Sequence, residues 1–255
     1  MKLVVLGSGS TVPHPQRSSS AYWLETSGGN ILLDCSATAP HQMAKFGVDW
    51  PNLDAIWISH FHMDHVGGLG PLFAGTKHAP EMRERKNPLT IYGPKGTERL
   101  FDGISSARDY KLREQPFPVK VIEIDQAEKF EIVPGVEAVP MKTPHTDESV
   151  AIRISDGKTT LMYSSDTGFD EKIADFASGV ELMLLECTFV REKPSQKHLI
   201  LREAIHLINK AKPRRAMLTH FYPEWDNVDF EKEVAAQSPM CEVVQAEDGL
   251  TIETN

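Results

Sequence analysis

Short apolar runs separated by turn residues recur along the whole chain and predict a protein rich in strands. The runs at residues 55–58 and 180–185 indicate strands that are buried. Turn signals, such as the Asp-Gly pair at 156–157 and the Pro-Gly pair at 134–135, stand between neighbouring runs. The predicted strands are residues 3–6, 21–25, 31–33, 55–58, 89–92, 119–124, 129–133, 136–140, 150–154, 160–163, 180–185, 216–218, 243–245 and 250–252.

Helical signals lie between these strands. Leu201, Ala204, Ile205 and Ile208 recur at helical spacing and predict an amphipathic helix that opens at His198. Other helices are predicted at residues 40–46, 68–75, 97–110 (capped by Thr97), 170–177 and 230–237. No repeat or composition break divides the chain, and its 255 residues fit one large α/β domain, residues 1–255, with a substantial core.

Composition favours a cytoplasmic protein outside the membrane. The chain starts directly as a strand and lacks the features of a signal peptide, and no run approaches the roughly 20 apolar residues that span a bilayer. Cys35, Cys187 and Cys241 are far apart and odd in number, which indicates reduced thiols. The net charge of −9 argues against a large nucleic-acid surface but allows a small anionic substrate.

Four potential metal ligands follow the buried run at 55–58: His60, His62, Asp64 and His65. On an extended chain His60 and His62 project to one side, so Phe61 and Met63 are expected to face a core. Imidazole and carboxylate at this density suit Zn²⁺, with Mn²⁺ or Fe as alternatives.

Three further candidates each follow a predicted strand or turn: His145, Asp166 and His220. Together with the first cluster they make seven ligands. This number is enough for two divalent ions bridged by one carboxylate, which would lie roughly 3.5–4 Å apart.

The ordered set resembles the metallo-β-lactamase superfamily, and the resemblance extends over nearly the whole chain. It implies a four-layer αββα sandwich, in which two mixed sheets are flanked by helices. The last two predicted strands, residues 243–245 and 250–252, are expected to close the second sheet. The resemblance also implies that His60, His62 and His145 hold one ion, that Asp64, His65 and His220 hold the other, and that Asp166 bridges them. Asp34 is expected to hold a ligand imidazole or the ligand backbone in place. Asp166 departs from true β-lactamases, which carry cysteine there, and His62 departs from the flavodiiron branch, which carries glutamate.

Residues 7–25 and the Glu186-Cys187-Thr188 segment with the downstream His198 resemble the ribonuclease Z-like branch. The resemblance implies hydrolysis by a metal-bound hydroxide. Glu186 and His198 would form a proton shuttle to the leaving group, and Asp64 would both ligate a metal and accept the proton of the water. His14 either lines the site or lies on an exposed loop.

A phosphodiesterase that acts on a small, cyclic or nucleotide phosphodiester is therefore favoured. A lactone, ester or thioester hydrolase on the same two ions is the alternative, and a metal-dependent oxygenase or binding protein is a third class. A tRNA 3′-end endonuclease is less favoured, because a tight hairpin fills residues 146–165 and leaves no tRNA-binding arm. By analogy the protein could form a homodimer. Residues 77–88 are a solvated loop or a lid whose contacts would be His78, Arg83, Arg85 and Lys86.

Overall fold

The side chains of the first strand are divided between two hydrophobic cores. The computed structural model describes residues 1–254. In β1 (Lys2–Gly7), Leu3 and Val5 belong to one core cluster, whereas Val4 and Leu6 belong to the other. Successive side chains of a strand point to opposite faces, so a strand that is covered on both faces needs apolar residues at consecutive positions.

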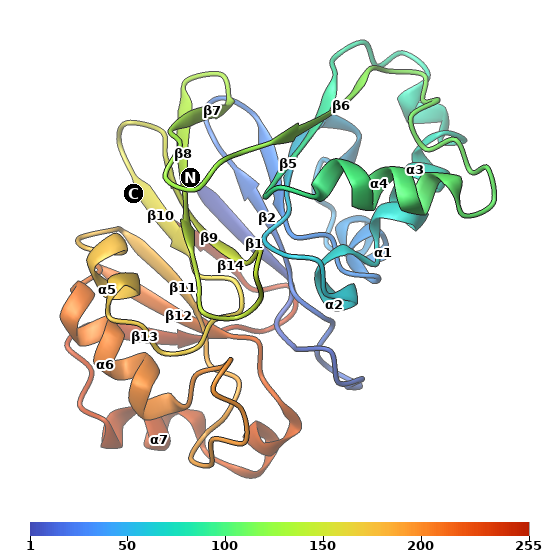
Figure 1. Ribbon diagram of the computed structural model, residues 1–255. Helices are drawn as coiled ribbons and strands as arrows, with labels where there is room; N and C mark the ends of the chain where they lie inside the picture. Colours follow the sequence, from blue (N-terminus) through green and yellow to red (C-terminus); the bar gives the residue numbers. More distant parts are fainter. Residues whose placement is uncertain (255) are drawn as a thin grey trace.

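Two mixed seven-stranded sheets face each other (Figure 1). Aromatic contacts join them: the ring centroids of Tyr22 and Tyr163 are 5.1 Å apart, and those of Trp57 and Phe130 are 6.0 Å apart. The first sheet has the order β14 (Thr251–Glu253), β1, β2 (Ala21–Glu25), β3 (Asn30–Leu33), β4 (Leu53–Trp57), β5 (Leu89–Gly93) and β6 (Val119–Glu123). The second has the order β13 (Glu242–Gln245), β12 (Arg215–Thr219), β11 (Leu182–Glu186), β10 (Thr160–Tyr163), β9 (Val150–Ser155), β8 (Val136–Lys142) and β7 (Phe130–Val133).

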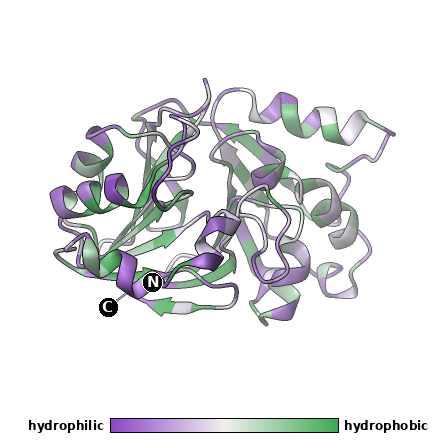
Figure 2. Ribbon diagram, turned by 90° about the horizontal axis from the view of Figure 1, so that it is seen from below, coloured by the Kyte–Doolittle hydropathy of each residue, from purple (hydrophilic) through white to green (hydrophobic). Residues whose placement is uncertain are grey.

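Helices form the outer layers and confirm the predicted αββα arrangement. Figure 2 shows hydrophobic residues concentrated in the central strands and hydrophilic residues on the outer helices. Among residues 1–254, no helix combines the length and the apolar character needed to cross a bilayer. The helices are α1 (Ala39–Lys45), α2 (Met63–Val66), α3 (Leu69–Thr76), α4 (Thr97–Ser106), α5 (Lys172–Phe176), α6 (Leu201–Ala211) and α7 (Phe230–Ala236), with single 3₁₀ turns at Trp50–Asn52, Pro80–Met82 and Pro223–Asn227.

The C-terminal strand lies in the first sheet, so the prediction that it closes the second sheet is wrong. Strand β14 pairs antiparallel with β1, and Ile252 lies opposite Leu3. Backbone hydrogen bonds from Gly249 to Val5 and from Val5 to Leu250 turn the chain back onto β1 after β13. The amino- and carboxyl-terminal strands therefore pair with each other.

The cap predicted for one helix and the start predicted for another differ from the structure. Thr97 does not cap α4; its hydroxyl donates to the Pro94 carbonyl, and the carboxylate of Glu123 accepts the backbone N–H groups of Gly96 and Glu98. Helix α6 begins at Leu201, so His198 lies in the loop before it. That loop position leaves the His198 side chain outside the helical face that packs on the core.

The loop of residues 77–88 does not cover the predicted metal ligands. The Arg85 guanidinium donates to the carbonyls of Pro51 and Leu53, at the start of β4, and Met82 is buried in the adjoining core. The ligand cluster follows the other end of β4. The loop is thus attached to the opposite end of this strand from the candidate ligands.

Parallel strands bring several candidate side chains to one edge. Strands β10, β11 and β12 run parallel to one another. The carboxyl ends of parallel strands meet at one edge of a sheet, so Asp166, Glu186 and His220 emerge close together. The ligand loop after β4 of the first sheet reaches the same place.

Candidate active site

The ligand loop is extended through His62 and becomes helical at Met63. His62 has φ −67° and ψ 146°, and α2 follows it directly. His60 and His62 therefore lie side by side, with ring centroids 4.7 Å apart, as the alternation predicts. Phe61 packs against a core, but the expectation for Met63 is wrong: it is 71% exposed because the two-residue periodicity ends where the helix begins.

The structure brings all seven predicted ligands together. His145, Asp166 and His220 follow β8, β10 and β12, respectively. Three sets of residues have ligand atoms that lie within 4.8 Å of one another, and each set could hold a metal ion. Two of these sets contain only predicted ligands and share Asp166; they consist of His60, His62, His145 and Asp166, and of Asp64, His65, Asp166 and His220. The third consists of Glu186, His198 and His220.

Asp166 lies between the two sets with one oxygen toward each. Its Oδ2 is 3.8 Å from His60 Nε2 and 3.6 Å from His145 Nε2. Its Oδ1 is 3.3 Å from both His65 Nε2 and His220 Nε2. This is the arrangement that a bridging carboxylate requires.

Several atoms of the cluster are buried without a hydrogen-bond partner. Among the described residues, the Nε2 atoms of His60, His65 and His220 make no aligned hydrogen bond. Burial, and then the neighbouring imidazole of His65, lower the pKa of His60 far below its usual value. Burial opposes ionisation of Asp166, but the imidazoles of His220 and His65 hold the pKa of this carboxyl well below its usual range. Imidazole nitrogens and carboxylate oxygens are donors that bind divalent ions, so the buried Nε2 atoms without partners and the shared carboxylate fit two such ions.

Asp34 holds the ligand loop, as expected. Its side chain is fully buried. Oδ2 lies 2.6 Å from His65 Nδ1 and accepts the hydroxyl groups of Ser59 and Tyr163, while Oδ1 accepts the Ser59 N–H. Because Nδ1 of His65 faces Asp34, its Nε2 is left to face the cluster.

Other ligands have partners that the sequence did not reveal. His60 Nδ1 lies 3.1 Å from the Ser59 hydroxyl, and His145 Nδ1 lies 3.0 Å from the Lys197 carbonyl. His220 Nδ1 lies 2.9 Å from the Thr188 hydroxyl. Ser59 adjoins His60 in the sequence, but nothing in the sequence connects the other two pairs, which come from distant segments.

Glu186 and His198 form the predicted pair. His198 Nδ1 lies 2.8 Å from Glu186 Oε1, and Glu186 is 1% exposed. Burial lowers the pKa of His198, but the hydrogen bond and the charge of Glu186 outweigh it and raise this pKa above its ordinary value. The His198 ring stacks on that of His220, with centroids 5.4 Å apart, so the pair lies directly beside the candidate ligands.

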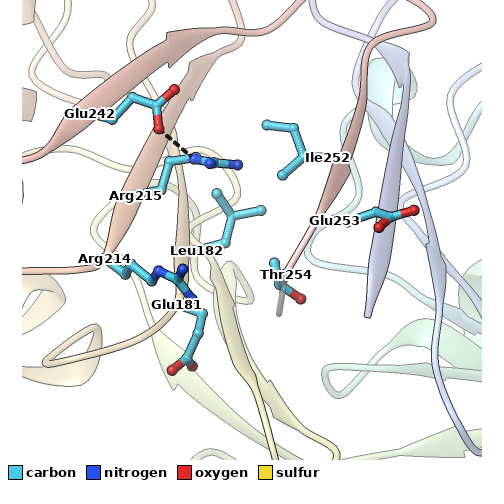
Figure 3. A pocket seen from close by; sticks show the side chains of 8 residues that line it. All are labelled: Glu181, Leu182, Arg214, Arg215, Glu242, Ile252, Glu253 and Thr254. Atoms are coloured by element: carbon cyan, nitrogen blue, oxygen red, sulfur yellow. Dashed lines mark hydrogen bonds and ion pairs between the residues drawn. The ribbon is translucent and has the colours of Figure 1, made fainter.

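One surface hollow borders the candidate ligands, and another lies away from them. An open hollow of about 760 Å³ borders His145 and is lined by Lys142, Lys197 and neighbouring polar residues. A second, of about 360 Å³, lies at the starts of β11 and β12 and is lined by residues such as Arg215 and Glu242 (Figure 3). The second contains none of the candidate ligands, because these lie at the other end of the same strands.

His14 lies outside both ligand sets. Its Nε2 is 2.8 Å from Asp226 Oδ2, and its Nδ1 accepts the backbone N–H groups of Gln16 and Arg17. His14 thus fastens the loop after β1 to the turn after β12, and it does not line the cluster.

Sequence comparisons connect the chain with metallo-hydrolases. A family model described as Anti-Pycsar protein Apyc1 matches residues 1–242. The curated ribonuclease Z of Agathobacter rectalis is 24% identical over an alignment of 281 positions, which covers 90% of each chain. The probable metallo-hydrolase YhfI of Bacillus subtilis is 25% identical over 231 residues, which cover 86% of each chain.

Solved structures share the fold. The metallo-β-lactamase fold protein YhfI from Bacillus subtilis matches with a TM-score of 0.83 at 24% identity, covering 98% of each chain. A diphosphatase from the PhnP family matches with a TM-score of 0.76 at 22% identity, covering 100% of this chain and 98% of that one. The fold predicted from the ordered ligands, that of the metallo-β-lactamases, is confirmed.

Proposed function

The chain belongs to the family described as Anti-Pycsar protein Apyc1 and is a metal-dependent hydrolase, and from this premise we propose that it is a two-metal phosphodiesterase for small, cyclic or nucleotide phosphodiesters. The observation that carries the proposal is the Glu186–His198 pair beside the ligand sets. An alkoxide is a poor leaving group until it is protonated, so hydrolysis of an alkyl diester gains from a positioned acid. Lactones and thioesters, whose leaving groups depart more readily, need no such pair.

We propose zinc as the resident metal, because imidazole and carboxylate donors suit it. One ion would be held by His60, His62 and His145, the other by Asp64, His65 and His220, with Asp166 between them. Bound there, two divalent ions would lower the pKa of an attacking water and neutralise charge on the phosphoryl oxygens.

The protein's own groups handle the protons. Asp64 Oδ2 lies 3.6 Å from His220 Nε2, and the Asp64 side chain is 8% exposed. From this position Asp64 would accept the proton of the attacking water. The Nδ1–H group of His198 donates a hydrogen bond to Glu186. Its Nε2 is therefore the atom that would donate a proton to the departing oxygen. Glu186 stabilises the protonated imidazole by its charge.

The surroundings of the ligands suit a small substrate rather than tRNA. The open hollow beside His145 carries the cationic side chains of Lys142 and Lys197 together with the acidic side chains of Asp147 and Glu148. Strands β9 and β10 are joined by a turn between Ser155 and Thr160, so no arm protrudes from this hairpin. For this reason we do not favour tRNA as the substrate, although several relatives are named ribonuclease Z.

Metal content and diester cleavage together test the proposal. The purified protein, reconstituted with zinc and desalted, should hold two ions per chain and cleave bis(p-nitrophenyl) phosphate in a reaction that a chelator stops. Asp166→Ala should lose at least one ion, whereas Asp175→Ala, which replaces an exposed aspartate of α5, should keep both. Retention of both ions by Asp166→Ala would refute the bridging role, and a fully loaded protein without diester turnover would refute the phosphodiesterase.

A further inference from the structure

The Thr188 hydroxyl lies between the proton-transfer pair and one set of metal ligands. It is 2.8 Å from Glu186 Oε2, 2.9 Å from His220 Nδ1 and 3.2 Å from His198 Nδ1. Thr188 is completely buried and follows the end of β11, and its backbone N–H also donates to Glu186. One hydroxyl therefore contacts three side chains of the candidate active site.

The chemistry of these groups fixes the direction of the hydrogen bonds. An ionised Glu186 can only accept, so the single hydroxyl proton of Thr188 is donated to Oε2. The Thr188 oxygen then accepts the Nδ1 proton of His220. With its proton on Nδ1, His220 presents a bare Nε2, which lies 3.3 Å from Asp166 Oδ1 and 3.6 Å from Asp64 Oδ2.

We propose that Thr188 is a positioning residue that fixes the tautomer and orientation of His220 and thereby joins one metal set to the proton-transfer pair. This proposal rests on the proposed function, because it needs a metal at Asp64, His65, Asp166 and His220. The relay runs from the His220 imidazole through the Thr188 hydroxyl to the Glu186 carboxylate. It corresponds to the carboxylate that commonly orients a metal-bound histidine, with a hydroxyl inserted between the two.

Each of the other histidines with a partner on Nδ1 is oriented without Thr188. Asp34 holds His65, Ser59 holds His60 and the Lys197 carbonyl holds His145. Loss of the Thr188 hydroxyl should therefore weaken the binding of one ion and leave the binding of the other unchanged. If Thr188 were purely structural, its replacement would weaken the binding of both ions together or of neither.

Thr188→Val removes the hydroxyl and keeps the branched shape, and Thr188→Ser keeps the hydroxyl. We expect Thr188→Val to bind one zinc ion 10- to 100-fold more weakly, as is typical when such a partner is lost, and to bind the other like the wild type. Thr188→Ser should restore both affinities. The readout is competition between each metal-free protein and a chromophoric zinc chelator, which resolves the two sites without any assay of activity.

Thr159→Val supplies the matched control, because Thr159 is also buried and its hydroxyl also donates to a carboxylate, that of Asp156 in the β9–β10 turn. It should bind both ions like the wild type. Equal affinities in Thr188→Val and the wild type would overturn the role of Thr188, as would a Thr188→Ser variant no better than Thr188→Val. A wild-type protein that binds no zinc would instead remove the proposed function itself.

Discussion

His198 presents Nδ1 to Oε1 of Glu186 at 2.8 Å, and its ring stacks on the candidate metal ligand His220. Because a carboxylate only accepts hydrogen bonds, Nδ1 of His198 carries a proton in this arrangement. The proton that leaves for a substrate must then come from Nε2. One buried carboxylate thus determines which atom of the imidazole can act as the acid.

The effect of replacing His198 on turnover should depend on the leaving group of the substrate. We expect His198→Ala to cut turnover of alkyl phosphodiesters by about 10²-fold or more, since the departing alkoxide needs a proton. Diesters with a p-nitrophenolate leaving group should lose far less. The measurement is kcat for both substrate types with the zinc content recorded in parallel, which should not change. His206→Ala, which removes an exposed histidine of α6, is the control, and equal losses on both substrate types would contradict the shuttle.

Replacement of Glu186 is expected to lower the stability of the fold, beyond the loss of the proton-transfer pair. The Glu186 carboxylate also accepts the backbone N–H groups of Thr167, Thr188 and Leu199. Glu186→Gln should therefore lower the free energy of unfolding by about 1–3 kcal/mol, because buried donors lose their acceptor. Chemical denaturation of the zinc-loaded protein measures this. Glu192→Gln, an exposed neighbour in the sequence, should leave stability unchanged, and a Glu186 variant as stable as that control would show that these contacts contribute nothing.

Asp34→Asn tests the support of the ligand loop. Asp34 has φ 57°, and asparagine tolerates this left-handed backbone, so the change affects the hydrogen bonds rather than the chain. An amide has one acceptor oxygen, whereas Asp34 accepts through both of its oxygens. Zinc affinity should fall by about 10- to 100-fold. Chelator competition measures it, and an Asn variant with wild-type affinity would show that Asp34 does not orient His65.

Gly168 allows the loop that carries His198 to lie against the segment that carries Asp166. A Cβ at Gly168 would lie 2.2 Å from the Gln196 carbonyl oxygen, so one backbone segment would have to move. The movement should displace His198. Gly168→Ala should therefore lower turnover of alkyl diesters at least tenfold, because a small displacement of a catalytic group commonly lowers the rate on the order of 10²-fold. A Cβ at Gly103 of α4 meets no atom within 4 Å, so Gly103→Ala should turn over like the wild type. Full activity in Gly168→Ala would mean that the position of this loop is unimportant.

The candidate ligands could be predicted from the sequence because the residue types that bind metal stand at recognisable positions. His60, His62, Asp64 and His65 lie within six residues, and the others follow predicted strands, whose carboxyl ends lie at one edge of the mixed second sheet. Met63 was assigned wrongly because the alternation of a strand was continued past the residue where a helix begins.

Contacts between distant segments could not be read from the chain. The sequence contains no sign that Thr188 faces His220 or that Lys197 faces His145, since each pair depends on the packing of separate strands and loops. The pairing of β14 with β1 was missed for the same reason, because either sheet offers an edge to a short apolar strand. The basic composition of residues 77–88 suggested contacts with the substrate. The Arg85 guanidinium instead donates to backbone carbonyls at the start of β4.

The most direct test is the relative kcat/KM of one zinc-loaded preparation on a generic aryl phosphodiester, a lactone and a thioester. The account predicts chelator-sensitive cleavage of the phosphodiester, with the lactone and the thioester cleaved far more slowly. Efficient cleavage of the lactone or thioester without diester turnover would contradict it. The metal ligands would then stand, and Glu186 and His198 would have to be assigned a role other than proton transfer to a phosphodiester leaving group.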